Sequence, residues 1–299
     1  MSLLPTKPKQ KPKLEDISFL LLIGPVKIGF TEASLQLPNA LHIDLQAGAK
    51  NFSGNAFSID VLKVAMKAKL TESITENGIE KTITRPMKNK WESLHEIIKE
   101  LRKKKAEEDF MYDFLIIDPA ASLEEIARFR ALELYETSVY KRKGSNDPTK
   151  YVQFDIGFQK GIDMLQMAFE EIINDLRNLT PHLIMKCHPK DNVALKQDKE
   201  VTVEGLDLLK PIAGWLAKEV DSIGVLYRAE HNVNKVSFVK TDNNPLVGAR
   251  ASHISNKIID FSTHDKNGNI TTNWESIYLH LKQTNLKPIK SETNEPTTV

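Results

Sequence analysis

Several features are scarce in this sequence, and each scarcity excludes a class of protein. The chain of 299 residues has one cysteine, Cys187, which excludes an internal disulfide framework and suits a reducing compartment. Because Cys187 lies in an apolar run, we expect it to pack in the core. The net charge is only +1, from 41 basic and 40 acidic residues, so no general field directs the chain to nucleic acid or membranes. Any such binding must therefore be local.

Long apolar stretches are also missing. No segment approaches the length of a membrane span, and the N-terminal residues do not form a signal peptide, so we expect a cytoplasmic protein without membrane contact. Residues 1–13 combine lysines with prolines and residues 287–299 are polar, a composition that predicts two disordered tails. The remaining residues, 14–286, are expected to form one domain.

Between the tails, short apolar runs alternate with segments of helical periodicity, which is typical of a sheet covered by helices. The predicted buried strands are residues 19–23, 40–44, 114–117 and 182–187. The predicted helices are residues 91–101, a helix opened by a capping box of Ser122 and Glu125, and residues 155–179. Two later strands, 223–227 and 235–240, are separated by turns rich in asparagine. The fold class is therefore α/β, with a mainly parallel sheet and a C-terminal antiparallel β portion.

A glycine-rich loop joins the first predicted strand to a short helix that Pro38 ends. The loop matches the phosphate-binding pattern G-x-x-x-x-G-K-[ST] at every fixed position except one, where Phe30 replaces lysine. Its glycines allow a tight turn that directs backbone N–H groups at an anion, and the hydroxyl of Thr31 can reach a metal ion. The candidate nucleotide-binding residues are Gly24, Pro25, Val26, Lys27, Ile28, Gly29, Phe30 and Thr31.

The strand at residues 114–117 ends in Asp118, which is the arrangement that holds Mg²⁺ next to a phosphate-binding loop. Thr31 and Asp118 are therefore the candidate metal ligands. A hydrophobic run that ends in an acid is weak evidence alone, and a glycine-rich turn is often only a turn. Found in this order along one chain, the two elements together favour a nucleotide site.

Five stretches of the chain resemble successive blocks of the phage-encoded RecA-superfamily P-loop ATPases, some of which are single-strand annealing proteins. The blocks are GPVKIGFT, LPNALHIDLQAG, YDFLIIDPAASLEE, LTPHLIMKCHPKD and EGLDLLKPIAGWLAKEVDSIGVLYR, and the resemblance covers about residues 17–280. It implies a RecA-like core that binds ATP and Mg²⁺ and acts on single-stranded DNA in recombination or replication. It also implies a homo-oligomer in the cytoplasm of a host cell.

Three positions depart from that family. Phe30 replaces the phosphate-binding lysine, and Pro119 follows Asp118 where the family commonly has serine or threonine. Gln46 stands where an acid would activate water, and an amide orients water but cannot accept its proton. We therefore expect impaired hydrolysis, with Gln46 as the residue in the catalytic position.

Other residues leave alternatives open. Lys27 is a possible substitute for the missing lysine, although a loop-surface role is favoured. His188 lies where RecA-like proteins sense the γ-phosphate, or it bonds to backbone. Arg228 and Arg250 either reach a neighbouring subunit's phosphates or are solvated, and solvation is favoured. His182 and His188 lie too far apart along one strand to chelate one ion.

Three functions are consistent with these residues. The leading one is a nucleotide-binding protein that acts on single-stranded DNA and hydrolyses ATP slowly or not at all. The first alternative is an active DNA-dependent ATPase in which Lys27 and a neighbouring subunit repair the site. The second is a structural or scaffolding protein that retains only the fold.

Overall fold

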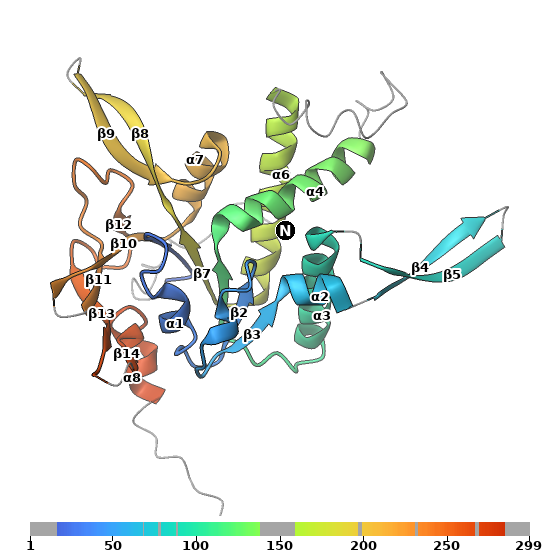
Figure 1. Cartoon of the computed structure of the whole chain (residues 1–299), viewed down its shortest axis with the longest axis horizontal. Helices are drawn as coiled ribbons and strands as arrows, with labels where there is room; N and C mark the ends of the chain where they lie inside the picture. Colours follow the sequence, from blue (N-terminus) through green and yellow to red (C-terminus); the bar gives the residue numbers. More distant parts are fainter. Residues whose placement is uncertain are drawn as a thin grey trace, which may run out of the picture.

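The computed structural model of the chain describes residues 17–67, 69–76, 79–87, 89–137, 159–196, 199–230, 233–266 and 269–284. Both predicted tails lie outside these residues, as does the expected start of the helix at 155–179. The molecule is built on a ten-stranded sheet in the order β14-β13-β11-β10-β1-β7-β6-β2-β3, with β12 also paired to β10 (Figure 1).

Six neighbouring strands of this sheet are parallel. They are β10 (Ser222–Arg228), β1 (Phe19–Ile23), β7 (His182–Cys187), β6 (Phe114–Asp118), β2 (Ala40–Asp44) and β3 (Phe57–Asp60). β1, β2, β6 and β7 are buried along their whole length, because helices or loops cover both faces of the sheet. All four predicted strands of the first part of the chain are therefore confirmed, and the α/β fold is confirmed with them.

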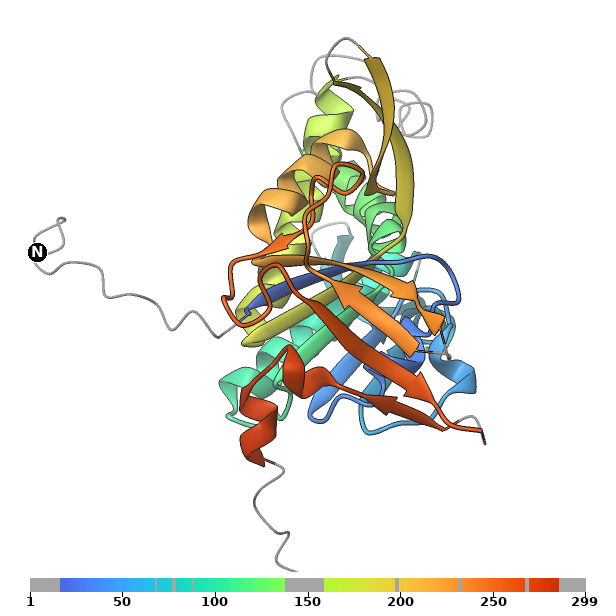
Figure 2. The same ribbon diagram turned by 90° about the vertical axis from the view of Figure 1, so that its left-hand side faces the viewer.

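The C-terminal strands extend the sheet in antiparallel fashion, as Figure 2 shows from the side where they face the viewer. They are β11 (Val233–Ser237), β12 (Gly248–Ala249), β13 (Ile258–His264) and β14 (Ile270–Thr272). The predicted antiparallel portion is confirmed. The strand expected at 235–240 begins and ends earlier, because Phe238 already leaves the ladder and packs in the core.

Two hydrophobic cores lie on the two faces of the sheet. One face is covered by α3 (Lys90–Ala106), α4 (Ala120–Thr137), α6 (Gln159–Leu179) and α7 (Lys210–Glu219). The other is covered by α1 (Phe30–Ser34), by η5 (Trp274–Ser276) and by buried side chains of residues 251–281, with α8 (His280–Thr284) at the end of this segment. Trp274 fastens α1 to this C-terminal layer, since its indole N–H donates to the carbonyl of Ala33 at 2.9 Å.

The capping box predicted at Ser122 is wrong. Helix α4 begins two residues earlier, at Ala120, so Ser122 lies inside the helix and its hydroxyl accepts a hydrogen bond from the Gln46 side chain. The sequence after Asp118 is compatible with a helix that begins at either Ala120 or Ser122. Ser122 therefore contacts Gln46, in the segment after β2, and does not cap the helix.

Two β-hairpins extend from the body of the molecule and were not predicted. They are β4 (Lys69–Glu76) with β5 (Ile79–Pro86), and β8 (Pro189–Lys196) with β9 (Lys199–Leu206). Figure 1 shows them projecting on opposite sides of the sheet. Two further short elements precede the first hairpin, η1 (Ala49–Asn51) and α2 (Val61–Lys67).

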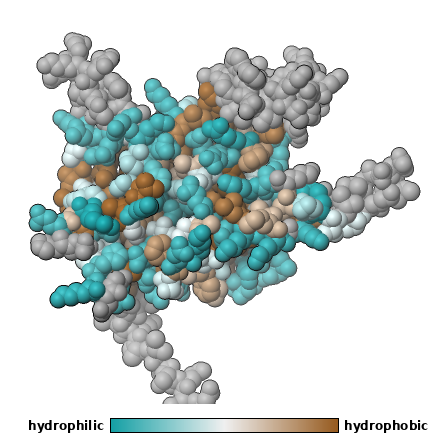
Figure 3. All heavy atoms as spheres, in the orientation of Figure 1, coloured by the Kyte–Doolittle hydropathy of each residue, from teal (hydrophilic) through white to brown (hydrophobic). Residues whose placement is uncertain are grey.

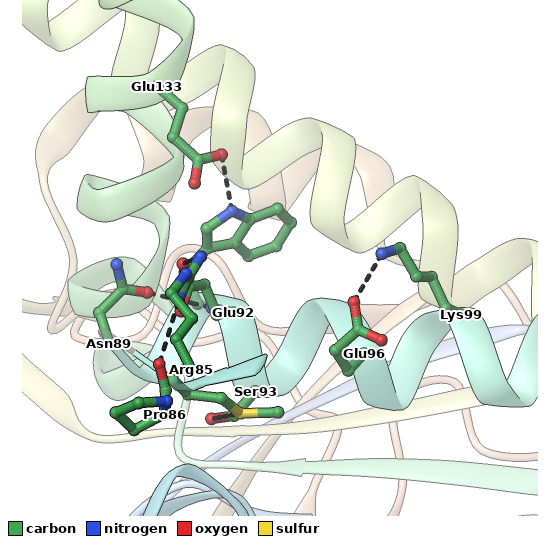
Figure 4. Close-up of polar contacts among 10 residues, drawn as sticks. Arg85, Pro86, Asn89, Glu92, Ser93, Glu96, Lys99 and Glu133 are labelled. Carbon is green, nitrogen blue, oxygen red and sulfur yellow. Dashed lines mark hydrogen bonds and ion pairs between the residues drawn. The ribbon is translucent and has the colours of Figure 1, made fainter. Parts of the chain in front are cut away.

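The first hairpin is attached to α3 by polar contacts. Arg85 forms a two-pronged ion pair with Glu92, and Asn89 caps the helix by accepting from the backbone N–H of Glu92 (Figure 4). The indole of Trp91 in turn donates to Glu133 of α4. These contacts occupy the charged groups near the base of the hairpin, and we assign them a structural role. The face of the molecule that Figure 3 shows is a mixture of hydrophilic residues and smaller hydrophobic patches.

Candidate functional site

The loop between β1 and α1 is a tight turn at the carboxyl end of the sheet. Its start is fixed because the N–H of Gly24 donates to the carbonyl of Cys187 at 3.0 Å. Gly29 has φ = 89°, a left-handed conformation that favours glycine, and a side chain there would meet the amide of Asn234. Lys27 also has a positive φ, of 63°. Local sequence therefore specifies the turn, and helix α1 follows it from Phe30 to Ser34.

The loop forms one wall of a cavity of about 330 Å³. All the predicted loop residues from Val26 to Thr31 line it, and so do Gln46, Asp118 and His188. Gly24 and Pro25 belong to the loop but do not line the cavity. Segments that are far apart in the sequence thus meet at the carboxyl ends of β1, β2, β6, β7 and β10, where open α/β sheets bind ligands.

Asp118 is at the centre of the site, where four side chains meet. Its Oδ2 accepts a hydrogen bond of 2.6 Å from the hydroxyl of Thr31. Nε2 of His42 lies 3.5 Å from the same oxygen, and Nζ of Lys186 lies 3.8 Å from Oδ1. The two predicted metal ligands are therefore adjacent, and two basic side chains that the sequence analysis did not select join them.

The charge on Asp118 follows from these neighbours. Burial alone would raise the pKa of this carboxyl, but the His42 ring, the positive charge of Lys186 and the Thr31 hydroxyl outweigh burial and lower the pKa below its ordinary value. Asp118 is consequently ionised at neutral pH. An ionised carboxylate suits a metal ligand and not a proton donor.

Gln46 lines the cavity with an amide and not an acid. Its Nε2 donates to the hydroxyl of Ser122 at 2.7 Å, which fixes the orientation of the side chain. The nearby Asp44 is buried, and its carboxylate accepts from three backbone N–H groups, those of Gln46, Gly48 and Ala49. Asp44 therefore holds the turn that positions Gln46.

His188 lines the cavity and contacts backbone, as one of its two predicted alternatives has it, while the sensing of a γ-phosphate stays a prediction. Its Nδ1 lies 3.1 Å from the carbonyl oxygen of Gly24. His182 lies at the other end of β7, where Nδ1 contacts the carbonyl of Ile17 at 2.8 Å. His182 begins β7 and His188 directly follows its end, so the two histidines lie at opposite ends of the strand. Within the described residues no group of three or more metal-binding side chains of His, Cys, Asp or Glu is present.

The two arginines considered from the sequence have different surroundings. Arg250 is on the surface and pairs with Asp221 at 3.1 Å, away from the cavity. Arg228 lines the cavity, although its side chain is exposed, and its Nε lies 3.4 Å from Oδ1 of Asn234. The C-terminal strands add another wall, where His264 contacts Glu32 at 2.9 Å.

The residues that sequence reasoning missed are the buried basic ones. Lys186 is 7% exposed and His42 is fully buried. A signal was present for each, because Lys186 interrupts the apolar residues of the strand His182–Cys187 and His42 interrupts those of Ala40–Asp44. A lysine or histidine within a fully buried strand needs a partner, and that need points to a site.

A family model described as an AAA domain matches residues 18–253 of the chain, from the start of β1 to beyond β10, the last parallel strand in the sequence. The chain belongs to the AAA domain family. This AAA domain is thus a P-loop nucleotide-binding domain with a mainly parallel sheet. No curated protein matches the chain.

The residues of this AAA domain fit a nucleotide with a divalent cation. The cavity volume lies within the range of ligand pockets, and the adjacent hydroxyl and carboxylate of Thr31 and Asp118 are oxygen donors of the kind that Mg²⁺ prefers. Among the described residues, no helix is long and apolar enough to cross a bilayer.

Cys187 is buried in the core, as the sequence predicted, and its reactivity can be tested. Burial raises the pKa of its thiol to about 12, so almost no thiolate exists at pH 8. We expect Ellman's reagent to find no reactive thiol in the native protein and one after denaturation in guanidinium chloride. Reaction of the native protein as fast as the denatured one would show that the loop region is open.

Proposed function

We propose that this AAA domain binds ATP and Mg²⁺ at the loop of residues 24–31 and hydrolyses ATP slowly or not at all. In this proposal it acts as an oligomer on single-stranded DNA during recombination or replication. Thr31 and Asp118 hold the cation, the loop N–H groups face the phosphates, and bound Mg²⁺ would neutralise phosphate charge. The family membership supports nucleotide binding, and the sequence resemblance to phage RecA-like proteins supports the action on DNA.

The observation that carries the impaired hydrolysis is the engagement of Gln46. Its side-chain N–H group donates to Ser122, so the carbonyl oxygen is left to orient a water molecule. An amide oxygen is too weak a base to take the proton of that water. The hydrogen bond therefore holds the Gln46 side chain in place, but the side chain cannot act as a base, which supports slow hydrolysis.

The carboxylates that line the cavity do not replace this missing base. Asp44 is saturated by three backbone N–H groups, and Asp118 is held among Thr31, His42 and Lys186. Glu32 is paired with His264. Because each of these carboxylates already has hydrogen-bond or ion-pair partners, none is placed as a free base for water, which favours slow turnover.

The two alternatives differ from this proposal in measurable ways. An active DNA-dependent ATPase requires a cation and a base from Lys27 and a neighbouring subunit, and Lys27 is an exposed loop residue here. A scaffolding protein would bind no nucleotide. Nucleotide affinity and turnover with and without DNA separate all three.

We expect a Gln46→Glu variant to hydrolyse ATP about 100-fold faster than the unaltered chain in single-turnover experiments. The reason is that a positioned general base contributes on the order of 10²–10⁴ in rate. The Ser122 hydroxyl can donate to the new carboxylate, so the side chain keeps its place. The matched control is Gln166→Glu, which adds the same charge on α6, outside the cavity, and should leave turnover unchanged.

Calorimetry with ATP and Mg²⁺ accompanies these rates, and both are repeated with single-stranded DNA and checked by gel retardation. Rapid hydrolysis by the unaltered chain that Asp118→Ala abolishes would contradict impaired turnover and favour the active ATPase. Absence of nucleotide binding would favour the scaffold. Failure to retain single-stranded DNA with or without ATP would contradict the proposed partner alone.

A further inference from the structure

Lys186 is a buried lysine in the middle of a parallel sheet, and the site geometry gives it a role. It belongs to β7, which lies between β1 and β6 at the centre of the sheet. Lys186 is paired in register with Leu22 of β1, two residues before the loop begins at Gly24. Strand β7 therefore places the lysine side chain close to the start of the loop.

The side chain points to the face that carries α1. Neighbouring residues of β7 alternate between faces, so Met185 and Cys187 pack in the core under α3, α4, α6 and α7, whereas Ile184 packs with Phe30. Lys186 shares the face of Ile184. Its Nζ lies over the ring of Phe30, 5.9 Å from the ring centroid.

This contact joins Lys186 to Phe30, the residue that replaces the usual loop lysine. Phe30 is 1% exposed and packs in the core below α1, and the residue is also among those that line the cavity. An aromatic face attracts an ammonium group, which favours a cation at this place. The position that normally carries the phosphate-binding lysine therefore supports a lysine that comes from another strand.

The pairing of Lys186 leaves its ammonium group able to reach a ligand. The distance of 3.8 Å to Asp118 is within the range of an ion pair but longer than a hydrogen bond, and Lys186 lines the cavity. A divalent cation bound by Thr31 and Asp118 would repel the ammonium from that carboxylate. The flexible stem of lysine then allows Nζ to turn toward the anionic part of the ligand.

The other basic side chains that line the cavity are placed differently. Lys27 and Arg228 are exposed, so water weakens their attraction for an anion, and Arg228 also contacts Asn234. His188 faces the carbonyl of Gly24. Among the basic residues that line the cavity, Lys186 is the buried lysine beside the proposed metal ligands.

We propose that Lys186 supplies the phosphate-binding positive charge that Phe30 cannot supply, so that the nucleotide is held by a lysine from β7. This inference rests on the proposed nucleotide binding and deepens it. The recognised group is the β,γ-phosphate part of a nucleoside triphosphate. Lysine binds such oxygens as a compact charge with three N–H donors.

The test is calorimetric affinity for ATP with Mg²⁺, measured on the full chain and on a Lys186→Met variant. Loss of one charge-assisted contact should weaken binding by about ten- to a hundredfold. Lys186→Arg, which keeps the charge, should lose less. Lys218→Met, which removes an exposed lysine on α7 outside the cavity, is the matched control and should bind as the unaltered chain does.

A rescue experiment separates charge from folding. Phe30→Lys in the Lys186→Met background returns a cation to the cavity from the usual loop position and should recover part of the lost affinity. If Lys186→Met does not fold alone, Asp118→Asn with Lys186→Met removes both charges of the buried pair. Its affinity for ATP in EDTA is then compared with that of Asp118→Asn, and a tenfold loss is expected.

The outcomes distinguish this inference from the function on which it rests. No binding by the unaltered chain contradicts the proposed nucleotide site itself. Binding by the unaltered chain that survives Lys186→Met, or that Lys27→Met abolishes while Lys186→Met does not, contradicts the role of Lys186 alone. Weakened binding that Phe30→Lys restores supports it.

Discussion

Phe30→Ala is expected to lower the free energy of unfolding by about 3–5 kcal/mol, as large-to-small changes of a buried aromatic residue typically do. The ring is 1% exposed and packs with buried residues of α1 and the C-terminal layer, so its removal leaves a cavity below the loop. The substitution also removes the aromatic face below Lys186. Urea denaturation of the nucleotide-free protein measures the loss.

The matched control for this prediction is Val26→Ala, in the same loop. Val26 is 72% exposed, so its truncation should change stability by no more than about 0.5 kcal/mol. If Phe30→Ala lowers the free energy of unfolding as little as Val26→Ala does, the Phe30 ring does not stabilise the core. Phe30 would then matter only as the residue that replaces the loop lysine.

Asp118→Asn is expected to cost about 3–5 kcal/mol of stability, because breaking a buried ion pair leaves the other charge uncompensated. Asp118 and Lys186 are 6% and 7% exposed, respectively, and their charged atoms lie 3.8 Å apart. The amide has nearly the same shape as the carboxylate, so packing is preserved. Urea denaturation again measures the change.

Two comparisons make this second prediction specific. Asp113→Asn, at the exposed start of the same strand region, should change stability by no more than about 0.5 kcal/mol. Adding Lys186→Met to Asp118→Asn should recover part of the loss, since the unpaired charge is removed as well. A double variant less stable than either single one would show that the pair does not act as a unit.

These predictions share one physical basis, which is that the site is also part of the core. Phe30 fills the volume under α1, and Lys186 and Asp118 compensate each other within the sheet. Phe30 stands in the place of the usual loop lysine where two adjacent strands, β6 and β7, carry an acid and a cation, Asp118 and Lys186.

The sequence by itself determined the α/β class, the four buried strands of the first part, the loop and the acid at Asp118. These features are local: the period of apolar residues sets each strand, and Gly29 sets the turn. Residue spacing also placed Thr31 and Asp118 in one candidate site. The assigned roles of Gln46 and His188, the two tails and the partners stay predictions.

Only the tertiary structure decided which side chains share the cavity and what each already contacts. Ser122 was predicted to cap a helix and instead holds Gln46, because α4 begins at Ala120. Lys186 and Asp118 are 68 positions apart in the printed numbering, and only the parallel pairing of β6 with β7 brings them together. Local sequence patterns do not specify which strands are neighbours in a sheet. The position of Lys186 beside Phe30 therefore follows only from the tertiary structure.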